Sequence, residues 1–194
     1  MSETLRIGLV LTGSFCTFEK ALAAAEKLAE KYDVTALMSE TAYATDTRFG
    51  AAAEFVSRLE QITGKPVLHT IAQAEPIGPQ GMFDVLAVAP CTGGTLAKLA
   101  LGITDTAATM AVKSQLRGGR PVVLAFGSND GLGASARNLG ALLTRRDIYF
   151  LPMYQDDPLE KPRSLAGDYD RLEAAILAAL AGRQLQPIIG GKPE

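Results

Sequence analysis

Four short apolar runs constrain the fold of this chain more than any other feature of its sequence. The runs are RIGLVLT (6–12), DVTALMS (33–39), DVLAVAP (84–90) and PVVLAFG (121–127). Apolar residues fill nearly every position in them, which is typical of strands that are buried on both faces of a parallel sheet. A fifth run, IYFLP (148–152), predicts one more strand.

Stretches with helical periodicity separate these runs and follow the last of them. They cover residues 17–32, 51–64, 106–119, 135–147 and 168–183. Strand alternating with helix predicts an α/β fold with three layers, a Rossmann-like or flavodoxin-like parallel sheet flanked by helices. A chain of 194 residues has the size of one domain, so we expect a single domain over 1–184 and a C-terminal tail over 185–194.

The composition excludes several classes of protein. The net charge is -2 and no basic run is longer than two residues, so we expect no nucleic-acid partner. The N-terminus has no basic segment, and its apolar stretch is too short to cross a bilayer, which predicts a cytoplasmic protein without membrane contact. Two Cys and one His provide neither a disulfide framework nor a metal-ligand cluster, so we expect no metal.

Ligands of open parallel sheets bind at the carboxyl ends of the strands, so the loops that follow the strands are the candidate sites. The first loop contains Gly13, which lets a ligand approach the backbone, and Ser14, which offers an N–H and a hydroxyl at a helix start. This arrangement suits one phosphate. The alternative is that the loop only turns and caps the helix. The loop lacks the G-x-G-x-x-G pattern, which disfavours NAD binding by this chain.

The loops after the next two strands are also rich in hydroxyls. Ser39 is a second candidate phosphate contact or, alternatively, an N-cap. In the segment CTGGTLAKLALGITD, Thr92 and Thr95 bracket Gly93 and Gly94 at the start of a helix, so that a planar polar ring can lie against bare backbone. Lys98 then balances an anionic ligand edge, or extends its ammonium into solvent at a helix boundary.

Three further features leave alternatives open. Asn129 offers a donor and an acceptor to a ligand, or forms a turn. Cys16 near a helix start is either an acid or nucleophile, or a small buried side chain. The loop QDDPLEKPR (155–163) either closes over the site, with Lys161 or Arg163 on a substrate carboxylate, or is a solvated loop, or is a surface for another subunit.

Together these loops resemble the flavoprotein family, which includes FMN-binding cysteine decarboxylases. The family pattern P-x-S-A-N-T-x-x-K-x-A-x-G-x-x-D is matched in position by Pro90, Thr92, Gly93, Gly94, Thr95, Lys98, Ala100, Gly102 and Asp105. The resemblance implies FMN as the cofactor. By the same resemblance its phosphate is held by Gly13, Ser14 and Ser39, and its ring is flanked by Thr92, Gly93, Gly94 and Thr95.

Gly94 stands where the family has Asn, so an amide side chain is missing near the expected flavin. The catalytic His and the late Cys of the decarboxylases have no clear counterpart, which disfavours decarboxylation. His69 lies too far upstream, and no Cys follows Cys91. We therefore assign no catalytic residue.

A narrower resemblance covers almost the whole chain. Segments such as GLVLTGSFCTFEKA, LAKLALGITDTAATMAVKSQLRGGRPVVLA and IYFLPMYQDDPLEKPRS resemble the B-subunit family of the dipicolinate synthases of spore-forming bacteria. This implies an oxidoreductase component that works with an NAD(P)-binding A subunit to oxidise dihydrodipicolinate to dipicolinate during sporulation, in the cytoplasm of the mother cell. The resemblance also implies a homo-oligomer.

The resemblance leaves the role of this chain within such an enzyme open. Lys98 and Asn129 are the candidate contacts to the dicarboxylate substrate. The alternatives are a non-catalytic scaffold subunit that binds a phosphorylated small molecule and an FMN-dependent enzyme related to the cysteine decarboxylases.

Overall fold

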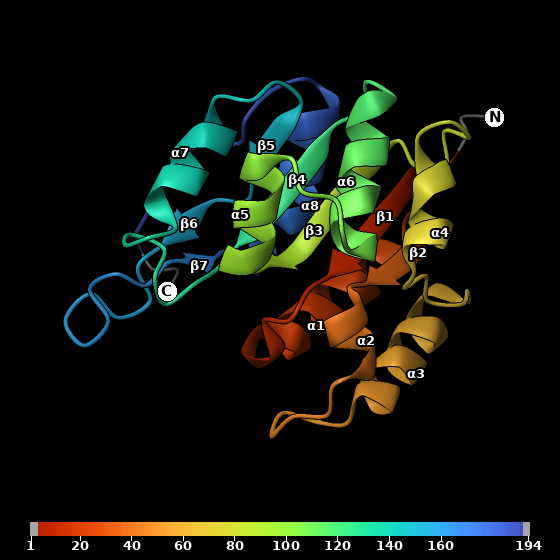
Figure 1. Cartoon of the computed structure of the whole chain (residues 1–194), viewed down its shortest axis with the longest axis horizontal. Helices are drawn as coiled ribbons and strands as arrows, with labels where there is room; N and C mark the ends of the chain where they lie inside the picture. Colours follow the sequence, from red (N-terminus) through yellow and green to blue (C-terminus); the bar gives the residue numbers. More distant parts are fainter. Residues whose placement is uncertain (1–3, 192–194) are drawn as a thin grey trace.

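A single parallel sheet forms the centre of the molecule, whose computed structural model describes residues 4–191. Its five strands lie in the order β2-β1-β3-β4-β5 (Figure 1). Their bounds are Arg6–Leu11 (β1), Asp33–Met38 (β2), Val85–Cys91 (β3), Val122–Phe126 (β4) and Ile148–Phe150 (β5). Every pairing in the sheet is parallel, so all five carboxyl ends lie at one edge.

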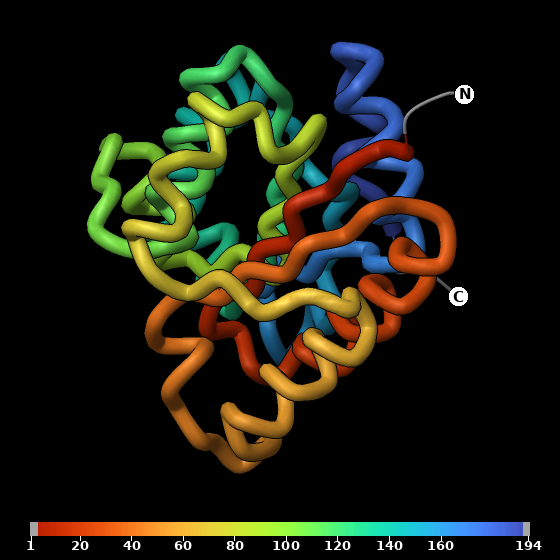
Figure 2. The backbone as a smooth tube through the Cα atoms, turned by 90° about the vertical axis from the view of Figure 1, so that its right-hand side faces the viewer, coloured from red at the N-terminus to blue at the C-terminus, as the bar shows by residue number. Residues whose placement is uncertain are grey.

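Helices cover both faces of this sheet and make three layers. The α-helices span Phe18–Ala29 (α1), Glu40–Ala44 (α2), Ala52–Thr63 (α3), Ile71–Ala74 (α4), Gly93–Leu101 (α5), Ala107–Arg117 (α6), Ala136–Leu143 (α7) and Leu172–Leu180 (α8). Short 3-10 turns span Phe15–Thr17 (η1), Glu75–Ile77 (η2) and Tyr169–Arg171 (η3). In Figure 2, α5 and α6 in green lie on one side of the strands and α8 in blue lies on the other.

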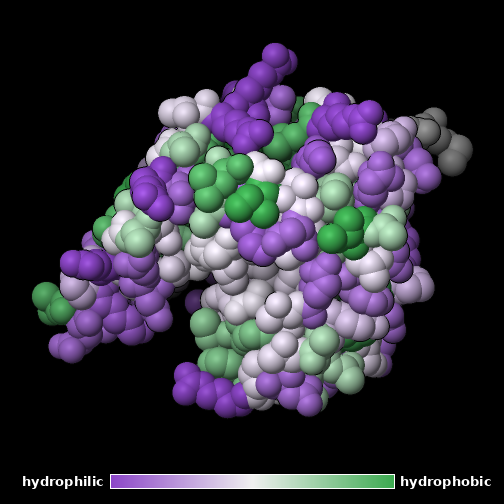
Figure 3. Space-filling view, in the orientation of Figure 1, coloured by the Kyte–Doolittle hydropathy of each residue, from purple (hydrophilic) through white to green (hydrophobic). Residues whose placement is uncertain are grey.

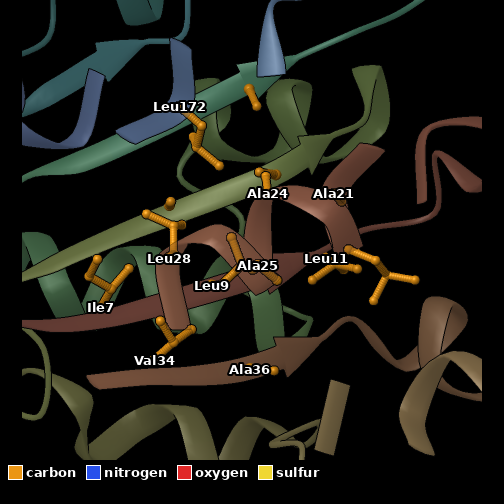
Figure 4. Close-up of a cluster of buried hydrophobic side chains, with 14 of the residues drawn as sticks. Ile7, Leu9, Leu11, Ala21, Ala24, Ala25, Leu28, Val34, Ala36 and Leu172 are labelled. Carbon is orange, nitrogen blue, oxygen red and sulfur yellow. The ribbon is translucent and has the colours of Figure 1, made fainter. Parts of the chain in front are cut away.

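The alternation of side chains along β1 divides the core into two halves. Ile7, Leu9 and Leu11 pack with α1, α3 and α8, whereas Val10 packs on the opposite face with α5, α6 and α7. Figure 4 shows the first half, where β1 faces three alanines of α1, namely Ala21, Ala24 and Ala25. Small residues at these positions let α1 lie close to the sheet. The apolar runs of the sequence are therefore buried on both faces, as predicted.

Every strand and helix predicted from the sequence is present, with bounds that differ at their ends, and the α/β fold with a flanked parallel sheet is confirmed. The short helices α2 and α4 were not predicted. The antiparallel pair β6 (Met153–Tyr154) and β7 (Ala166–Gly167) was not predicted either. Elements this short contain too few residues for a periodic pattern to be detected.

The end of the described chain runs beside β6. The Met153 N–H donates to the Ile188 carbonyl oxygen at 2.8 Å, and the Gly190 N–H donates to the Met153 carbonyl oxygen at 2.9 Å. Residues 192–194 of the expected tail lie outside the described residues, and the division into domain and tail stays a prediction. Within residues 4–191, no helix has the length and apolar character needed to span a membrane.

Alanine substitution of two glycines, one closely packed and one in open space, tests the packing of this fold. A Cβ at Gly8 in β1 would lie 2.5 Å from Leu86 Cδ1 and 2.6 Å from Phe83 Cδ2, whereas a Cβ at Gly140 in α7 would meet nothing within 4 Å. We expect Gly8→Ala to lower the free energy of unfolding by about 1–3 kcal/mol through overpacking. The matched control Gly140→Ala should raise it by about 0.5–1 kcal/mol, because Ala has the smaller backbone entropy cost in a helix.

Urea denaturation of both variants measures this difference. Equal effects of the two substitutions would contradict the close packing at β1.

Candidate functional site

The loops that follow β1, β2 and β3 are fastened to one another by hydrogen bonds. The Ser39 N–H donates to the Leu11 carbonyl oxygen at 2.9 Å, which joins the end of β2 to the end of β1. The buried Thr12 hydroxyl donates to the Pro90 carbonyl oxygen at 2.8 Å and accepts from the Thr92 N–H at 3.0 Å. Thr12 therefore bridges the first and third loops, and the three candidate loops lie side by side.

The Ser14 side chain is not used as a helix cap. Ser14 precedes η1, but its hydroxyl accepts no capping hydrogen bond. Its one side-chain hydrogen bond among the described residues is with the Cys16 thiol, at 4.0 Å from Oγ to Sγ. The first amides of a helix have no acceptor within the helix, so Phe15 and Cys16 offer N–H groups beside this hydroxyl. The loop therefore presents several hydrogen-bond donors together.

Ser39 and Thr92 both act as N-caps. Ser39 Oγ accepts from the Ala42 N–H at 3.3 Å and caps α2, and Thr92 Oγ1 accepts from the Thr95 N–H at 3.1 Å and caps α5. Thr92 Oγ1 also donates to Thr95 Oγ1 at 3.0 Å. The capping alternative stated for Ser39 is thus confirmed, whereas the capping role of Thr92 was not predicted. A hydroxyl can donate and accept at the same time, so the cap does not use the Ser39 proton, although Ser39 itself is largely buried.

The two glycines at the start of α5 have different surroundings. A Cβ at Gly93 would lie 3.1 Å from Ser135 Oγ and 3.4 Å from Ser128 Oγ, so Gly93 permits the close approach of the segment after β4. A Cβ at Gly94 would have only Thr92 Oγ1 nearby, at 3.9 Å. Gly94 is exposed, and its bare backbone faces open space. A flat ligand can therefore approach the chain at this position.

Lys98 is paired with Asp105. Its Nζ lies 2.9 Å from Asp105 Oδ1 and 3.0 Å from Oδ2, and this ammonium lowers the pKa of the Asp105 carboxyl. The cap of α6 is Thr106, which forms a capping box with Thr109, so a capping role for Asp105 is not observed. Lys98 follows Thr95 by three residues and shares its helix face. An anionic ligand would compete with Asp105 for this ammonium.

A pocket of about 160 Å³ lies beside these loops at the carboxyl edge of the sheet. Ser14 and Asn129 line it together, although they follow different strands, and Pro90 lies between their loops. Ser39, Lys98 and the segment 92–95 do not line this pocket. The structure thus brings Ser14 and Asn129 to one pocket and leaves the other predicted residues on the neighbouring loops and in α5.

Sequence reasoning missed several residues of this pocket. Asp156 and Ser164 line it from the loop between β6 and β7, and Tyr169 lines it from η3. The loop 155–163 was one candidate cover, through Lys161 or Arg163, but neither of these residues lines the pocket. No motif of the sequence points to Tyr169, because long-range packing alone brings it to the pocket.

The titratable groups of the pocket have different protonation states. The Ser164 hydroxyl beside Asp156 lowers the pKa of that carboxyl, although partial burial opposes the shift, so Asp156 is ionised at neutral pH. Its Oδ1 atom is buried and has no hydrogen-bond partner among the described residues. Burial raises the pKa of Tyr169, which stays protonated. The pocket therefore combines a carboxylate that can accept a proton with hydroxyls that can donate.

The two cysteines are in opposite environments. Cys16 is exposed and lines the pocket, so the interpretation of Cys16 as a small buried side chain was wrong. Cys91 is fully buried at the end of β3, and this burial raises its pKa to about 12. Among residues 4–191, no group of three or more His, Cys, Asp or Glu side chains is placed to hold a metal ion.

Comparison with known proteins supplies an independent line of evidence. The family model described as Flavoprotein matches residues 1–144. Over 185 residues the chain is 42% identical to the B subunit of dipicolinate synthase of Bacillus subtilis (strain 168), an alignment that covers 95% of this chain and 92% of that protein.

Solved structures agree with this family. The crystal structure of the B subunit of dipicolinate synthase from Bacillus halodurans C has a TM-score of 0.89 at 38% identity, over 97% of each chain. DmrB of Burkholderia xenovorans, solved in complex with FMN, has a TM-score of 0.70 at 20% identity, over 93% of this chain and 98% of that one. At that identity the second likeness shows the fold alone.

Thiol labelling tests the two cysteine environments. The thiolate is the reactive form, so Cys91 should resist a water-soluble disulfide reagent at pH 8 in the native protein, whereas the exposed Cys16 should react. We expect one reactive thiol per chain in buffer and both of the chain's two thiols in denaturant. Cys16→Ser should leave none reactive in the native state. Labelling of Cys91 in the folded Cys16→Ser variant would contradict the buried position of that thiol.

Proposed function

Because this chain belongs to the flavoprotein family and is a homologue of the dipicolinate synthase B subunit, we propose that it is the B subunit of such a synthase. In this proposal it works with an NAD(P)-binding A subunit in the cytoplasm of a sporulating mother cell and oxidises dihydrodipicolinate to dipicolinate. The oxidation removes a proton and a hydride, and the hydride passes in the end to the nicotinamide that the partner binds. The product ring is aromatic.

One observation supports a nucleotide site on this chain above all. The donors of three successive loops, those after β1, β2 and β3, are held together by the Thr12 bridge and the Ser39–Leu11 hydrogen bond. The edge where these loops meet is the usual ligand position in open α/β sheets. The first loop has no dinucleotide pattern, so the site suits a mononucleotide, and the nicotinamide belongs to the partner.

The residues present fit FMN. In the proposal Gly13, Ser14 and Ser39 hold the phosphate. Their loops provide hydroxyls and backbone amides at helix starts, which are uncharged hydrogen-bond donors that favour an anion. Thr92, Gly93, Gly94 and Thr95 flank the ring, and the open space at Gly94 supports this position. When bound, FMN would supply a two-electron carrier that can pass hydride between substrate and nicotinamide.

The substrate is proposed to occupy the pocket beside these loops. A pyridine-sized dicarboxylate needs several donors for its carboxylates, and Ser128 and Asn129 offer them there. Lys98, held by Asp105, is the proposed cation at the rim of the site. The ionised Asp156 is the one carboxylate among the lining residues and is suited to take the proton that aromatisation releases.

A second candidate function is a non-catalytic chain that binds a phosphorylated small molecule and supports the NAD(P)-binding partner. The capping roles of Ser39 and Thr92 favour it, because those hydroxyls have a structural role without any ligand. An assay of the partner in the absence of this chain separates the two functions. Full oxidation of dihydrodipicolinate by the partner without this chain would leave only the supporting role.

Comparison of FMN with riboflavin tests the phosphate site. We expect Ser14→Asp to weaken FMN binding at least about tenfold, or about 1.4 kcal/mol, because its carboxylate repels the phosphate, and to leave riboflavin binding nearly unchanged. Ser57→Asp on the exposed face of α3 is the matched control and should change neither affinity. Quenching of flavin fluorescence measures both. Equal loss of FMN and riboflavin would contradict the phosphate assignment.

Gly94→Val tests the ring position in the same assay. Its side chain would fill the open space at the start of α5, so we expect a loss of at least about tenfold in affinity for both flavins. Thermal melting should show a folded protein, since no neighbour obstructs the new side chain. A wild-type chain that binds neither flavin would exclude FMN as the cofactor and favour the supporting role.

A further inference from the structure

A hollow of about 430 Å³ shares no lining residue with the pocket of the candidate site. It is bounded by the end of α5, the last turns of α6 and the turn before β5, and its apolar floor consists of Leu99, Ile103, Val112, Leu116 and Ile148. Ile148 is the first residue of β5. The hollow therefore opens at the amino edge of the sheet, whereas the candidate site is at the carboxyl edge.

The rim of the hollow is positively charged. Lys113, Arg117 and Arg145 line it, and no carboxylate does. None of these three cations takes part in an ion pair within residues 4–191, and Arg145 Nη1 donates to the Leu99 carbonyl oxygen at 3.3 Å. An apolar floor inside a cationic rim is complementary to an apolar side chain flanked by carboxylates.

The chain itself carries such a group. Leu159 has an exposed fraction of 91%, the highest of any large hydrophobic side chain among the described residues. Asp157 and Glu160 flank it, and neither takes part in an ion pair within the described chain, because Lys161 pairs with Asp156 instead. Figure 3 shows this loop projecting from the body of the molecule, with a hydrophobic tip among hydrophilic residues.

The loop is held in one shape without any partner. Gln155 Nε2 donates to the Pro162 carbonyl oxygen at 2.9 Å and closes the loop at its base. The Lys161 N–H donates to the Asp157 carbonyl oxygen at 2.8 Å, and the Glu160 N–H donates to Asp157 Oδ1 at 3.1 Å. The Leu159 side chain is thus presented by an ordered turn, and its docking costs little ordering entropy.

We propose that the loop 155–163 of one copy of this chain docks into the hollow of a second copy. Leu159 enters the apolar floor, and Asp157 and Glu160 face Lys113 and Arg117. The loop follows β6 beyond the carboxyl edge of the sheet and the hollow opens at the amino edge, so the two cannot meet within one chain. The contact is therefore head to tail, and each copy offers one loop and one hollow.

Single substitutions test each side of the contact. In analytical ultracentrifugation of the full chain over a range of concentrations, we expect Leu159→Ser and Arg117→Glu each to weaken self-association at least about tenfold. Both positions are exposed, so the variants should stay folded, which circular dichroism checks. The matched control Leu177→Ser, at an exposed leucine of α8, should associate like the wild type.

Mixing the two variants tests the head-to-tail geometry. Leu159→Ser keeps an intact hollow and Arg117→Glu keeps an intact loop, so the mixture should form a one-to-one dimer and nothing larger. Glu160→Arg combined with Arg117→Glu in one chain should recover association that each change alone weakens. A wild-type chain that stays monomeric throughout would overturn the proposal, and so would an oligomer that both single variants leave intact.

Discussion

Burial of the central sheet on both faces is the constraint on which the rest of the structure depends. Because α1, α3 and α8 cover one face and α5, α6 and α7 cover the other, the strands leave almost no room for polar side chains. Polar chemistry is therefore displaced to the ends of the strands. Because all the strands pair in parallel, their carboxyl ends lie at a single edge of the sheet. At this edge the hydroxyl of Thr12 joins two loops that are far apart in sequence.

The sequence was sufficient for most of the fold and for part of the site. Long apolar runs and helical periods repeat over many residues, so each strand and major helix could be predicted from local pattern. Ser14 and Asn129 could be found for a related reason, since each directly follows a predicted strand. The helix caps could not be distinguished from ligand contacts, because Ser and Thr at a helix start serve both purposes equally well.

Other features of the site could not be predicted from the sequence, because they depend on contacts between distant segments of the chain. Asp156 and Tyr169 reach the pocket only through the short pair β6 and β7 and the turn η3, whose positions no periodic pattern encodes. The pairing of Lys98 with Asp105 depends on how the chain turns after α5. The exposure of Cys16 could not be predicted either, because it depends on how η1 packs on α1, where the rings of Phe15 and Phe18 lie against each other.

Ser39 and Thr92 each have two roles, as a helix cap and as a proposed ligand contact, which restricts the substitutions that this edge of the sheet tolerates. Each hydroxyl caps the start of a helix and accepts a hydrogen bond from a first-turn amide that would otherwise be unsatisfied. Each is also proposed to face a ligand. Replacement by an apolar residue would loosen a helix start and the binding surface at once. Ser, Thr, Asp and Asn, which can cap a helix, are therefore the residues best suited to these two positions, whichever ligand the loops bind.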